Sequence, residues 1–242
     1  ERLLKKFRQR LGKNPQADSN SRRNAWASGA SWELNFWEEF LAERLGNYRE
    51  TFLERMDATL PLQSYLEELI VQPEGASVRI LDVGAGPFTF VGRQSPRWPI
   101  EIVPVDPLAG GYDLLLAQYG ILPPVRTLQV AAEDLVTRLG PSSFDLVCCR
   151  NALDHTLDPV RALRQMVEIV KPGASISLHH QTNEGERNQY TGMHQWNFFL
   201  VNKEFIIAGG DDQVNVNRLF ADRANVRNEL LDGRWLVTTI TR

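Results

Sequence analysis

Short apolar runs alternate with helical stretches along the chain from Val78 onward. The runs are VRILDV, IEIVPV, VRTLQV, FDLVCC, ASISLHH, EFIIA and RWLVTTI. This alternation is typical of an α/β fold, in which helices cover both faces of a mostly parallel sheet. The Asp-Gly pair in LLDGRW predicts a tight turn between the last two strands. The pattern therefore predicts a sheet that ends in an antiparallel hairpin.

The residues before this pattern predict helices. ERLLKKFRQRLGK places apolar residues at helical spacing among basic ones, which favours a helix that docks on the protein, a partner subunit or an anionic surface. NPQADSNSRRNA is typical of a loop. SWELNFWEEFLAERLG predicts a helix from Ser31 to Gly46, and Pro61 can begin another. We interpret residues 1–75 as a helical N-terminal extension, or lid, and residues 76–242 as the main domain.

Composition restricts the class of protein. The 242 residues carry a net charge of -3, whereas a nucleic-acid-binding domain is usually basic. No apolar run approaches the roughly 20 residues that cross a membrane, so we expect no stable membrane insertion. Cys148 and Cys149 are adjacent in a strand and point to opposite faces, which indicates free thiols in a reducing cytoplasmic setting. The chain begins with Glu1 rather than Met, which leaves a removed upstream segment open.

A glycine loop follows the first strand, in VRILDVGAGPF. Gly84 and Gly86 allow a tight turn and a close approach of a ligand to the backbone. The next strand ends in Asp106, whose carboxylate can accept hydrogen bonds from both hydroxyls of a ribose. This spacing fits nicotinamide sites as well as other nucleoside sites, and Asp106 could instead cap a turn before Pro107. The third glycine of a dinucleotide loop is absent, which weakens a pyrophosphate interpretation.

Five ordered motifs in residues 78 to about 180 make the pattern more specific. They are DVGAGP, VDP, AAEDL, FDLVCCRNALDHTLDP and VKPGA. Together they resemble class I S-adenosylmethionine-dependent methyltransferases, of the type with an N-x-L-[ED]-H segment after the fourth strand. The resemblance implies a Rossmann-like, mostly parallel seven-stranded sheet with an antiparallel terminal hairpin, and S-adenosyl-L-methionine as the cofactor.

The resemblance also implies a set of cofactor-binding residues. Asp82, Gly84, Gly86 and Pro87 would line the methionine end of the cofactor, and Asp106 and Pro107 would hold the ribose. Ala132 and Glu133 would lie near the adenine, and Asn151 would border the cofactor after the fourth strand. The acid that many members use for the adenine amino group would fall near Ala131, where this chain has none.

His155 is the candidate general base. NALDH resembles the metal-binding E-x-x-E-H segment of ubiquinone-pathway O-methyltransferases, with Asn151 and Asp154 in place of the two glutamates. A neutral amide is a poor ligand for a hard cation, so we predict no metal. Histidine titrates near neutral pH and can accept the proton of a hydroxyl acceptor. The alternative is a structural His155 that caps a helix or packs under the cofactor, and His180 is the next candidate base.

The segment HHQTNEGERNQYTGMHQWNFF leaves the fifth strand at the ligand edge of such a sheet. We predict that residues 180–197 form one wall of an acceptor pocket, which the helix bearing Trp32 and Trp37 helps to close. The alternative is an ordinary polar loop. The predicted substrate-binding residues are Asn183, Glu184, Tyr190, His194 and Trp196.

TGMHQWNF and the tryptophan-rich N-terminal helix resemble a bacterial methyltransferase subgroup linked to cell-surface polysaccharides or natural products. The predicted function is therefore methyl transfer to a small-molecule acceptor, with a hydroxyl of a sugar-like or natural-product compound as the first choice. The alternatives are a nicotinamide-dependent oxidoreductase and a non-catalytic binding protein of the same fold. We expect no nucleic acid as partner, and the sequence leaves a homo-oligomer open.

Overall fold

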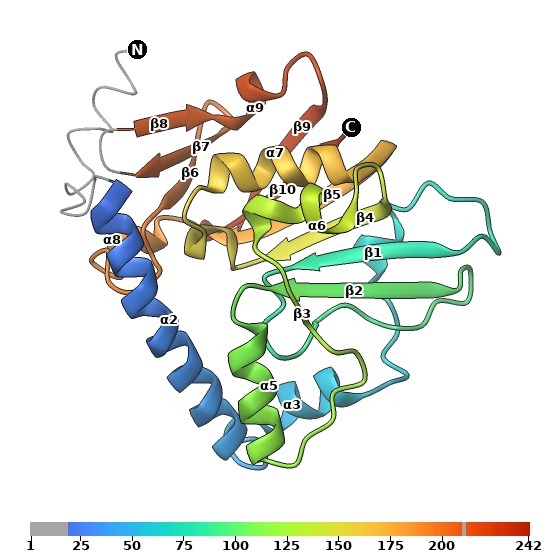
Figure 1. Cartoon of the computed structure of the whole chain (residues 1–242). Coiled ribbons are helices and arrows are strands. Elements are labelled where there is room, and N and C mark those ends of the chain that lie inside the picture. The colour runs from blue at the N-terminus through green and yellow to red at the C-terminus, as the bar shows by residue number, and fades with distance from the viewer. Residues whose placement is uncertain (1–18, 210–211) are drawn as a thin grey trace.

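The computed structural model describes residues 19–209 and 212–242. The basic helix expected in ERLLKKFRQRLGK lies outside the described residues. The described residues form two sheets, of seven and three strands, and helices pack around the larger one (Figure 1).

The larger sheet has the strand order β3-β2-β1-β4-β5-β10-β9. Strands β1 to β5 pair in parallel, whereas β10 runs antiparallel to both of its neighbours. This arrangement confirms the predicted seven-stranded, mostly parallel sheet with an antiparallel terminal hairpin. The strands of this sheet are β1 Val78–Val83, β2 Ile100–Asp106, β3 Leu128–Gln129, β4 Phe144–Arg150, β5 Val170–Gln181, β9 Asn225–Leu231 and β10 Trp235–Thr241.

The expected partner of the last strand was wrong. EFIIA lies in β7 (Glu204–Gly209), the centre of a separate antiparallel sheet with β6 (Asn197–Val201) and β8 (Asp212–Asn215). The hairpin partner of β10 is β9, whose sequence NVRNELL alternates between partly buried and exposed positions at the edge of the sheet. A search for apolar runs therefore misses β9 and selects the more buried β7 in its place.

The helices differ widely in length. The longest is α2, which runs diagonally past one side of the larger sheet, while α6 and α7 lie over one of its faces (Figure 1). The helices are α2 Ser19–Ala42, α3 Arg49–Met56, α4 Ser64–Glu67, α5 Ala109–Gln118, α6 Leu135–Leu139, α7 Pro159–Ile169, α8 Glu184–Arg187 and α9 Val216–Leu219, with 3-10 turns η1 Ala132–Asp134 and η2 Leu153–His155.

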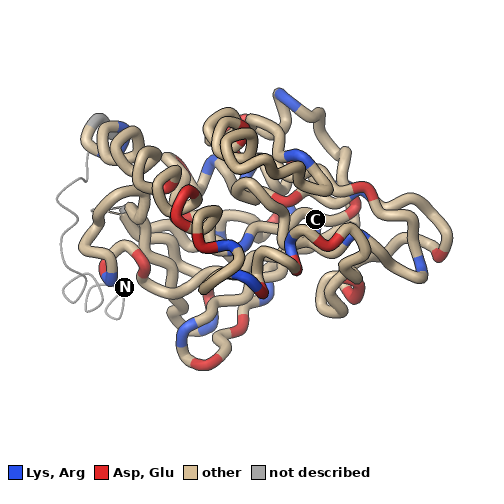
Figure 2. Tube along the Cα trace, turned by 90° about the horizontal axis from the view of Figure 1, so that it is seen from below, with Lys and Arg blue, Asp and Glu red and all other residues tan. Residues whose placement is uncertain are grey.

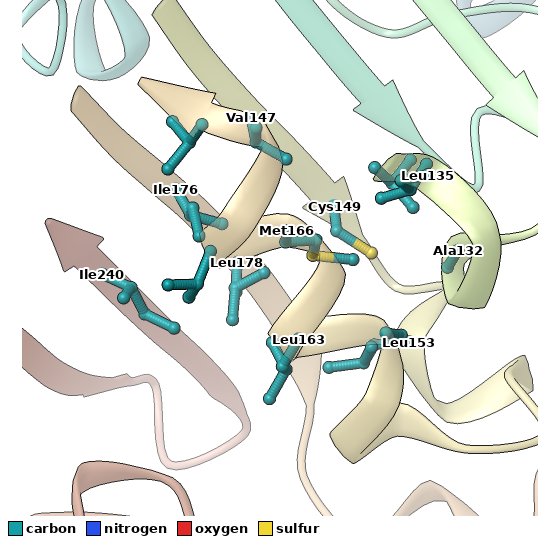
Figure 3. Close-up of a cluster of buried hydrophobic side chains, with 14 of the residues drawn as sticks. Ala132, Leu135, Val147, Cys149, Leu153, Leu163, Met166, Ile176, Leu178 and Ile240 are labelled. Carbon is teal, nitrogen blue, oxygen red and sulfur yellow. The ribbon is translucent and has the colours of Figure 1, made fainter. Parts of the chain in front are cut away.

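Side chains of the central strands divide between two apolar clusters because neighbouring residues of a strand point to opposite faces. Val147 and Cys149 pack with Leu163 and Met166 of α7, as Figure 3 shows. Cys148 instead joins the cluster on the other face. Both thiols are free and buried, which confirms the expectation for the two adjacent cysteines.

The N-terminal extension shares its core with the sheet domain. Trp37, Phe40 and Leu41 of α2 pack with Phe88 and Tyr112. The residues around α4 pack against the far face of the sheet; these are Leu62, Leu66 and Ile70. The division at residue 75 stays a prediction.

The start of the long helix differs from the sequence-based prediction. Ser31 lies inside α2 rather than at its N-cap, because the helix already begins at Ser19. Within the polar SNSRRNA segment the guanidinium carbon of Arg22 lies 4.7 Å from the centroid of the Trp196 ring. Among the described residues, no helix is both long and apolar enough to cross a membrane. Charges of both signs are interspersed along the trace in Figure 2, in keeping with the near-balanced composition.

Candidate active site

A cavity of about 1030 Å³ opens at the carboxyl ends of β1, β2 and β4. Ligand pockets commonly measure about 300–1,000 Å³, so this cavity has room for a cofactor and an acceptor together. Its walls come from the glycine loop, α2, α3, the turn after β4 and the segment that follows β5.

The glycine loop forms the floor of this cavity, and its glycines are required by sterics. Gly84 and Gly86 have φ of 73° and 64°, which a side chain disfavours. A Cβ atom on Gly84 would lie 2.3 Å from the Cβ of Ala152, and one on Gly86 would lie 2.6 Å from Cζ2 of Trp37. Trp37 therefore packs against the loop from α2, and it also lines the cavity.

Asp106 stands at the end of β2 beside this loop and lines the cavity. Its Oδ2 accepts a hydrogen bond from the Gly86 N–H at 3.1 Å, and its Oδ1 accepts one from the Leu108 N–H at 2.9 Å. Burial raises the pKa of the Asp106 carboxyl to about 6 although these two hydrogen bonds oppose the shift. The carboxylate is fixed in place, with further lone pairs for ligand hydroxyls.

Most of the cofactor-binding residues expected from the motifs gather in this cavity. Its lining includes Gly84, Gly86, Asp106, Pro107, Ala132, Glu133 and Asn151. Asp82 and Pro87 are buried outside the lining. The Oδ2 of Asp82 accepts a hydrogen bond from Oγ1 of Thr89 at 2.6 Å, so Asp82 supports the loop from below instead of facing the cavity.

Two histidines and a buried carboxylate meet at another part of the wall. His194 Nδ1 lies 2.7 Å from Oδ2 of Asp154 and 3.3 Å from Nε2 of His155. Asp154 is 2% exposed, whereas both histidines line the cavity. Oε2 of Glu33, from α2, lies 3.9 Å from Nδ1 of His155.

Asp154 dominates the electrostatics of this cluster. Burial by itself lowers the pKa of His194, but the hydrogen bond and charge of Asp154, together with the charges of Glu184 and Glu33, outweigh burial, and the net shift is upward. Burial likewise opposes ionisation of Asp154, yet the neighbouring His155 and His194 hold the pKa of its carboxyl below the usual value. A histidine that donates Nδ1–H to a carboxylate has its Nε2 available to accept a proton. This arrangement suits a general base.

The same three residues could converge on a cation, since one ligand atom from each lies within 4.8 Å of the others. Ligands about 2.0–2.2 Å from a metal, at right angles, would stand about 3 Å apart. The 2.7 Å between His194 and Asp154 is shorter and fits a direct hydrogen bond. We therefore treat the cluster as a hydrogen-bonded pair beside a second histidine.

His180, the reserve candidate for the base, lies outside the cavity lining. Its ring is 1% exposed and packs edge-on against Phe198, with ring centroids 5.4 Å apart. Burial lowers its pKa to about 4, so the ring is neutral. The geometry gives His180 no access to an acceptor, because strand β5 turns its side chain into the core.

The loop after β5 divides its side chains between the cavity and the core. Glu184 and His194 line the cavity as expected. Asn183, Tyr190 and Trp196 do not. The hydroxyl of Tyr190 accepts a hydrogen bond from Nδ2 of Asn197 at 2.9 Å, and the ring is buried.

Trp196 is a second case of an aromatic expected on the ligand and found in the core. Its indole N–H donates to the carbonyl of Thr156 at 2.9 Å, and its ring fills the space beside Gly209. Stacking on an acceptor is therefore not supported by the geometry of Tyr190 or Trp196.

Residues that sequence reasoning missed complete the wall. Trp26 of α2 donates its indole N–H to the carbonyl of His155 at 2.9 Å. Gly29 lets α2 approach the loop so closely that a Cβ there would lie 2.6 Å from Cγ of Met193. The small residues of WASGAS could have predicted that this part of the helix lies close to another segment. The further unpredicted lining residues of this wall are Glu33, Phe36, Asn188 and Thr191.

The charged residues of the cavity favour a cationic ligand. Among the described lining residues, five carboxyl side chains face two arginines: Glu33, Glu54, Asp106, Glu133 and Glu184 against Arg55 and Arg150. A sulfonium is attracted by such an excess of acid, whereas a pyrophosphate is repelled. The cavity thus fits S-adenosylmethionine better than a nicotinamide dinucleotide.

The strand order, the glycine loop and the acid after β2 together define the class I methyltransferase fold, as the sequence motifs predicted. The chain belongs to the family described as "Methyltransferase domain", whose model matches residues 2–207. This membership supports S-adenosylmethionine as the cofactor and argues against the nicotinamide alternative.

Curated relatives match the central part of the chain. An uncharacterized methyltransferase of Mycobacterium bovis is 32% identical over 109 residues, which are 45% of this chain and 42% of that protein. A ubiquinone biosynthesis O-methyltransferase of Xanthomonas euvesicatoria is 30% identical over 116 residues, 47% of each chain. The chain thus matches less than half the length of these relatives.

Solved structures support the fold. A methyltransferase in complex with the Haloferax volcanii Trm112 methyltransferase activator has a TM-score of 0.53 and 14% identity, over 86% of this chain and 95% of that chain. At this identity the similarity shows the fold alone.

Proposed function

We propose that this protein transfers the methyl group of S-adenosylmethionine to a hydroxyl of a small-molecule acceptor. The observation that carries the proposal is the His155–His194 pair, held by buried Asp154 and exposed to the same cavity as the glycine loop. A hydroxyl is a weak nucleophile and must lose its proton as it is methylated, so it needs a base at this place. A stronger nucleophile would be methylated without one.

S-adenosylmethionine would supply an electrophilic methyl group and would be released as neutral S-adenosylhomocysteine. The histidine pair is placed to take the proton of the acceptor hydroxyl, with Nε2 of His194 as the available ring nitrogen because its Nδ1 faces Asp154 and His155. Asp154 stabilises the imidazolium that results, because its carboxylate is already 2.7 Å from Nδ1 of His194. The proton then leaves to solvent.

A polar, ring-containing acceptor such as a sugar-like compound fits the remaining wall. Asn188 and Thr191 offer hydrogen bonds there, and Trp32 and Phe36 offer aromatic faces. Amides and hydroxyls suit the hydroxyls of such a compound, while aromatic faces suit its C–H surface. The relatives named as O-methyltransferases support oxygen as the acceptor atom.

The test uses S-adenosylmethionine with a labelled methyl group and a panel of sugars, phenols and amines. Mass spectrometry of the products should place the methyl group on oxygen. Titration calorimetry should detect S-adenosylhomocysteine and give no signal for NAD. Binding without transfer to any extract or compound would support the non-catalytic alternative, and transfer to nitrogen would exclude the proposed acceptor class.

A further inference from the structure

Two arginines of the cavity wall have no carboxylate partner. Arg55, in the last turn of α3, donates from Nη1 to the carbonyl of Phe88 at 2.9 Å, and its guanidinium carbon lies 5.7 Å from the centroid of the Trp37 ring. Arg150, the last residue of β4, stands over Phe90 with 5.5 Å between its guanidinium carbon and the ring centroid. Within the described ranges 19–209 and 212–242, neither arginine forms an ion pair within 4.0 Å.

These arginines lie at the end of the cavity where the glycine loop continues into Phe88 and Phe90. The largest acidic influence on Arg55 is that of Asp82, but Asp82 is buried under the loop and already bonded to Thr89. Glu54, the preceding residue of α3, also lines the cavity and acts on Arg55 more weakly. Asp106 is instead influenced by Glu33 and His155. The cavity thus has one end with two arginines and a larger acidic part.

Arg55 is partly buried, and burial disfavours the charged form of a guanidinium. Burial, reinforced by the charge of Arg150, lowers the pKa of Arg55. Arg55 uses one of its five N–H groups on Phe88, which leaves a planar fork of donors facing the cavity. Such a fork recognises a carboxylate in two parallel hydrogen bonds.

We propose that Arg55 and Arg150 form a carboxylate-binding subsite that holds the α-carboxylate of the methionine part of the cofactor. This assignment rests on the proposed function, because it takes S-adenosylmethionine as the ligand. The carboxylate is the one negative group of that ligand, and the sulfonium and ammonium groups then face the acidic part of the cavity. A residue of the N-terminal extension thereby completes the cofactor site of the sheet domain.

The test compares two ligands that differ in the amino-acid part. S-adenosylhomocysteine carries the α-carboxylate, whereas 5′-methylthioadenosine lacks it. Calorimetry on the full chain should show that Arg55→Gln and Arg150→Gln weaken S-adenosylhomocysteine about 10- to 100-fold, the range expected for a charge-assisted hydrogen bond. Both variants should bind 5′-methylthioadenosine as the wild type does.

Controls separate this subsite from other roles. Arg97 stacks on Trp98, is exposed and lies outside the cavity, so Arg97→Gln should leave the affinity for both ligands unchanged. Arg55→Lys keeps the charge without the fork and should fall between wild type and Arg55→Gln. Among the described residues the side chain of Arg150 is exposed and makes no hydrogen bond, so its variant should keep the melting temperature and remain informative if Arg55→Gln unfolds.

Each outcome decides the assignment. An equal loss for both ligands would make the arginines structural and overturn it. An unchanged affinity for S-adenosylhomocysteine with a raised KM for the acceptor would give the subsite to a carboxylate of the acceptor instead. Failure of the wild type to bind S-adenosylhomocysteine would reject the proposed function itself, and this assignment with it.

Discussion

The two ends of the cavity are built by different means. At the cofactor end, Gly84 and Gly86 directly follow β1 and Asp106 ends the adjacent β2, and their positions are fixed by hydrogen bonds and steric contacts. At the acceptor end, side chains from α2, the turn after β4 and the loop after β5 converge. The bond from Trp26 to His155 alone joins residues 129 apart in sequence.

This difference separates the binding of the cofactor from the chemistry on the acceptor. The cofactor end offers backbone groups, the Asp106 carboxylate and the two arginines of the proposed carboxylate subsite, which suits a ligand that never changes. The acceptor end offers titratable groups and aromatic faces on segments that loop lengths and sequence changes can alter without disturbing the sheet. Changes at the acceptor end should therefore alter turnover or acceptor KM, and changes at the cofactor end should alter cofactor affinity.

The largest effect should come from the histidine pair. His155→Ala and His194→Ala should each lower kcat by about 10²–10⁴, because general-base catalysis contributes that range. Because the two rings act as one unit with Asp154, the double variant should lose little more than either single one. Steady-state kinetics with the identified acceptor measures kcat, and calorimetry should find S-adenosylhomocysteine affinity unchanged.

The matched control is His179→Gln, since His179 lies outside the cavity lining and stacks beside Tyr65. Its kcat should equal that of the wild type. EDTA should also leave turnover unchanged; activity lost to the chelator and restored by a divalent cation would make Asp154, His155 and His194 metal ligands. Full activity in both alanine variants would exclude proton uptake by the pair.

A smaller effect, confined to the cofactor end, is expected for Gly84→Ala. The added Cβ would lie 2.3 Å from that of Ala152, in a backbone conformation with φ of 73°. Such strain costs about 1–3 kcal/mol, so affinity for S-adenosylhomocysteine should fall about 5- to 100-fold as the loop shifts. The affinity is measured by calorimetry and the stability by thermal melting.

Gly120→Ala is the control for strain without a clash. Gly120 has φ of 63°, and a Cβ there would meet nothing within 4 Å. This variant should lose some stability and keep its affinity for the ligand. An equal loss of affinity in both variants would mean that general destabilisation, not the shape of the loop, explains the result.

The features that the sequence predicted lie mainly in the sheet and at the cofactor end, and those it missed lie mainly at the acceptor end. The sheet, the glycine loop and Asp106 were predictable because each rests on short-range patterns: alternating apolar runs, a turn that needs glycine and an acid at a strand end. The edge strand β9 was missed because its polar, exposed residues give no apolar run.

At the acceptor end, composition selected Glu184 and His194, which line the cavity, together with Tyr190 and Trp196, which lie outside its lining. All four lie in one polar segment, and only tertiary packing decides which side chains face inward. The contact between Asp154 and His194, 40 residues apart, was likewise beyond any local pattern.

The pH dependence of binding probes the carboxylate of the cofactor end. Burial raises the pKa of Asp106 to about 6, so the group is ionised above that pH and protonated below it. Hydrogen bonds from ribose hydroxyls favour the ionised form; affinity for S-adenosylhomocysteine should therefore fall as pH falls through about 6, about tenfold at one pH unit below. Calorimetry between pH 5 and 8 is the measurement.

Asp106→Asn should bind more weakly at neutral pH and show a flatter profile. Burial raises the pKa of Asp82 to about 6 as well, and this second carboxyl accounts for any slope that remains. A wild-type profile without a decrease near pH 6 would exclude Asp106 from ligand binding.

The smallest expected effect is that of Trp32, which lines the cavity from α2 yet is 66% exposed. Trp32→Ala removes an aromatic face worth about 0.5–1.5 kcal/mol in a stacked contact, so the KM for the acceptor should rise about 2- to 10-fold. Stability should hardly change because the ring is mostly in solvent, and affinity for S-adenosylhomocysteine should stay constant because the glycine loop is untouched.

Leu45, at 69% exposed and outside the cavity, gives the matched control Leu45→Ala, which should leave KM unchanged. If Trp32→Ala instead lowered the affinity for S-adenosylhomocysteine and spared the acceptor KM, α2 would belong to the cofactor end, and the division between the two ends would have to be redrawn along that helix.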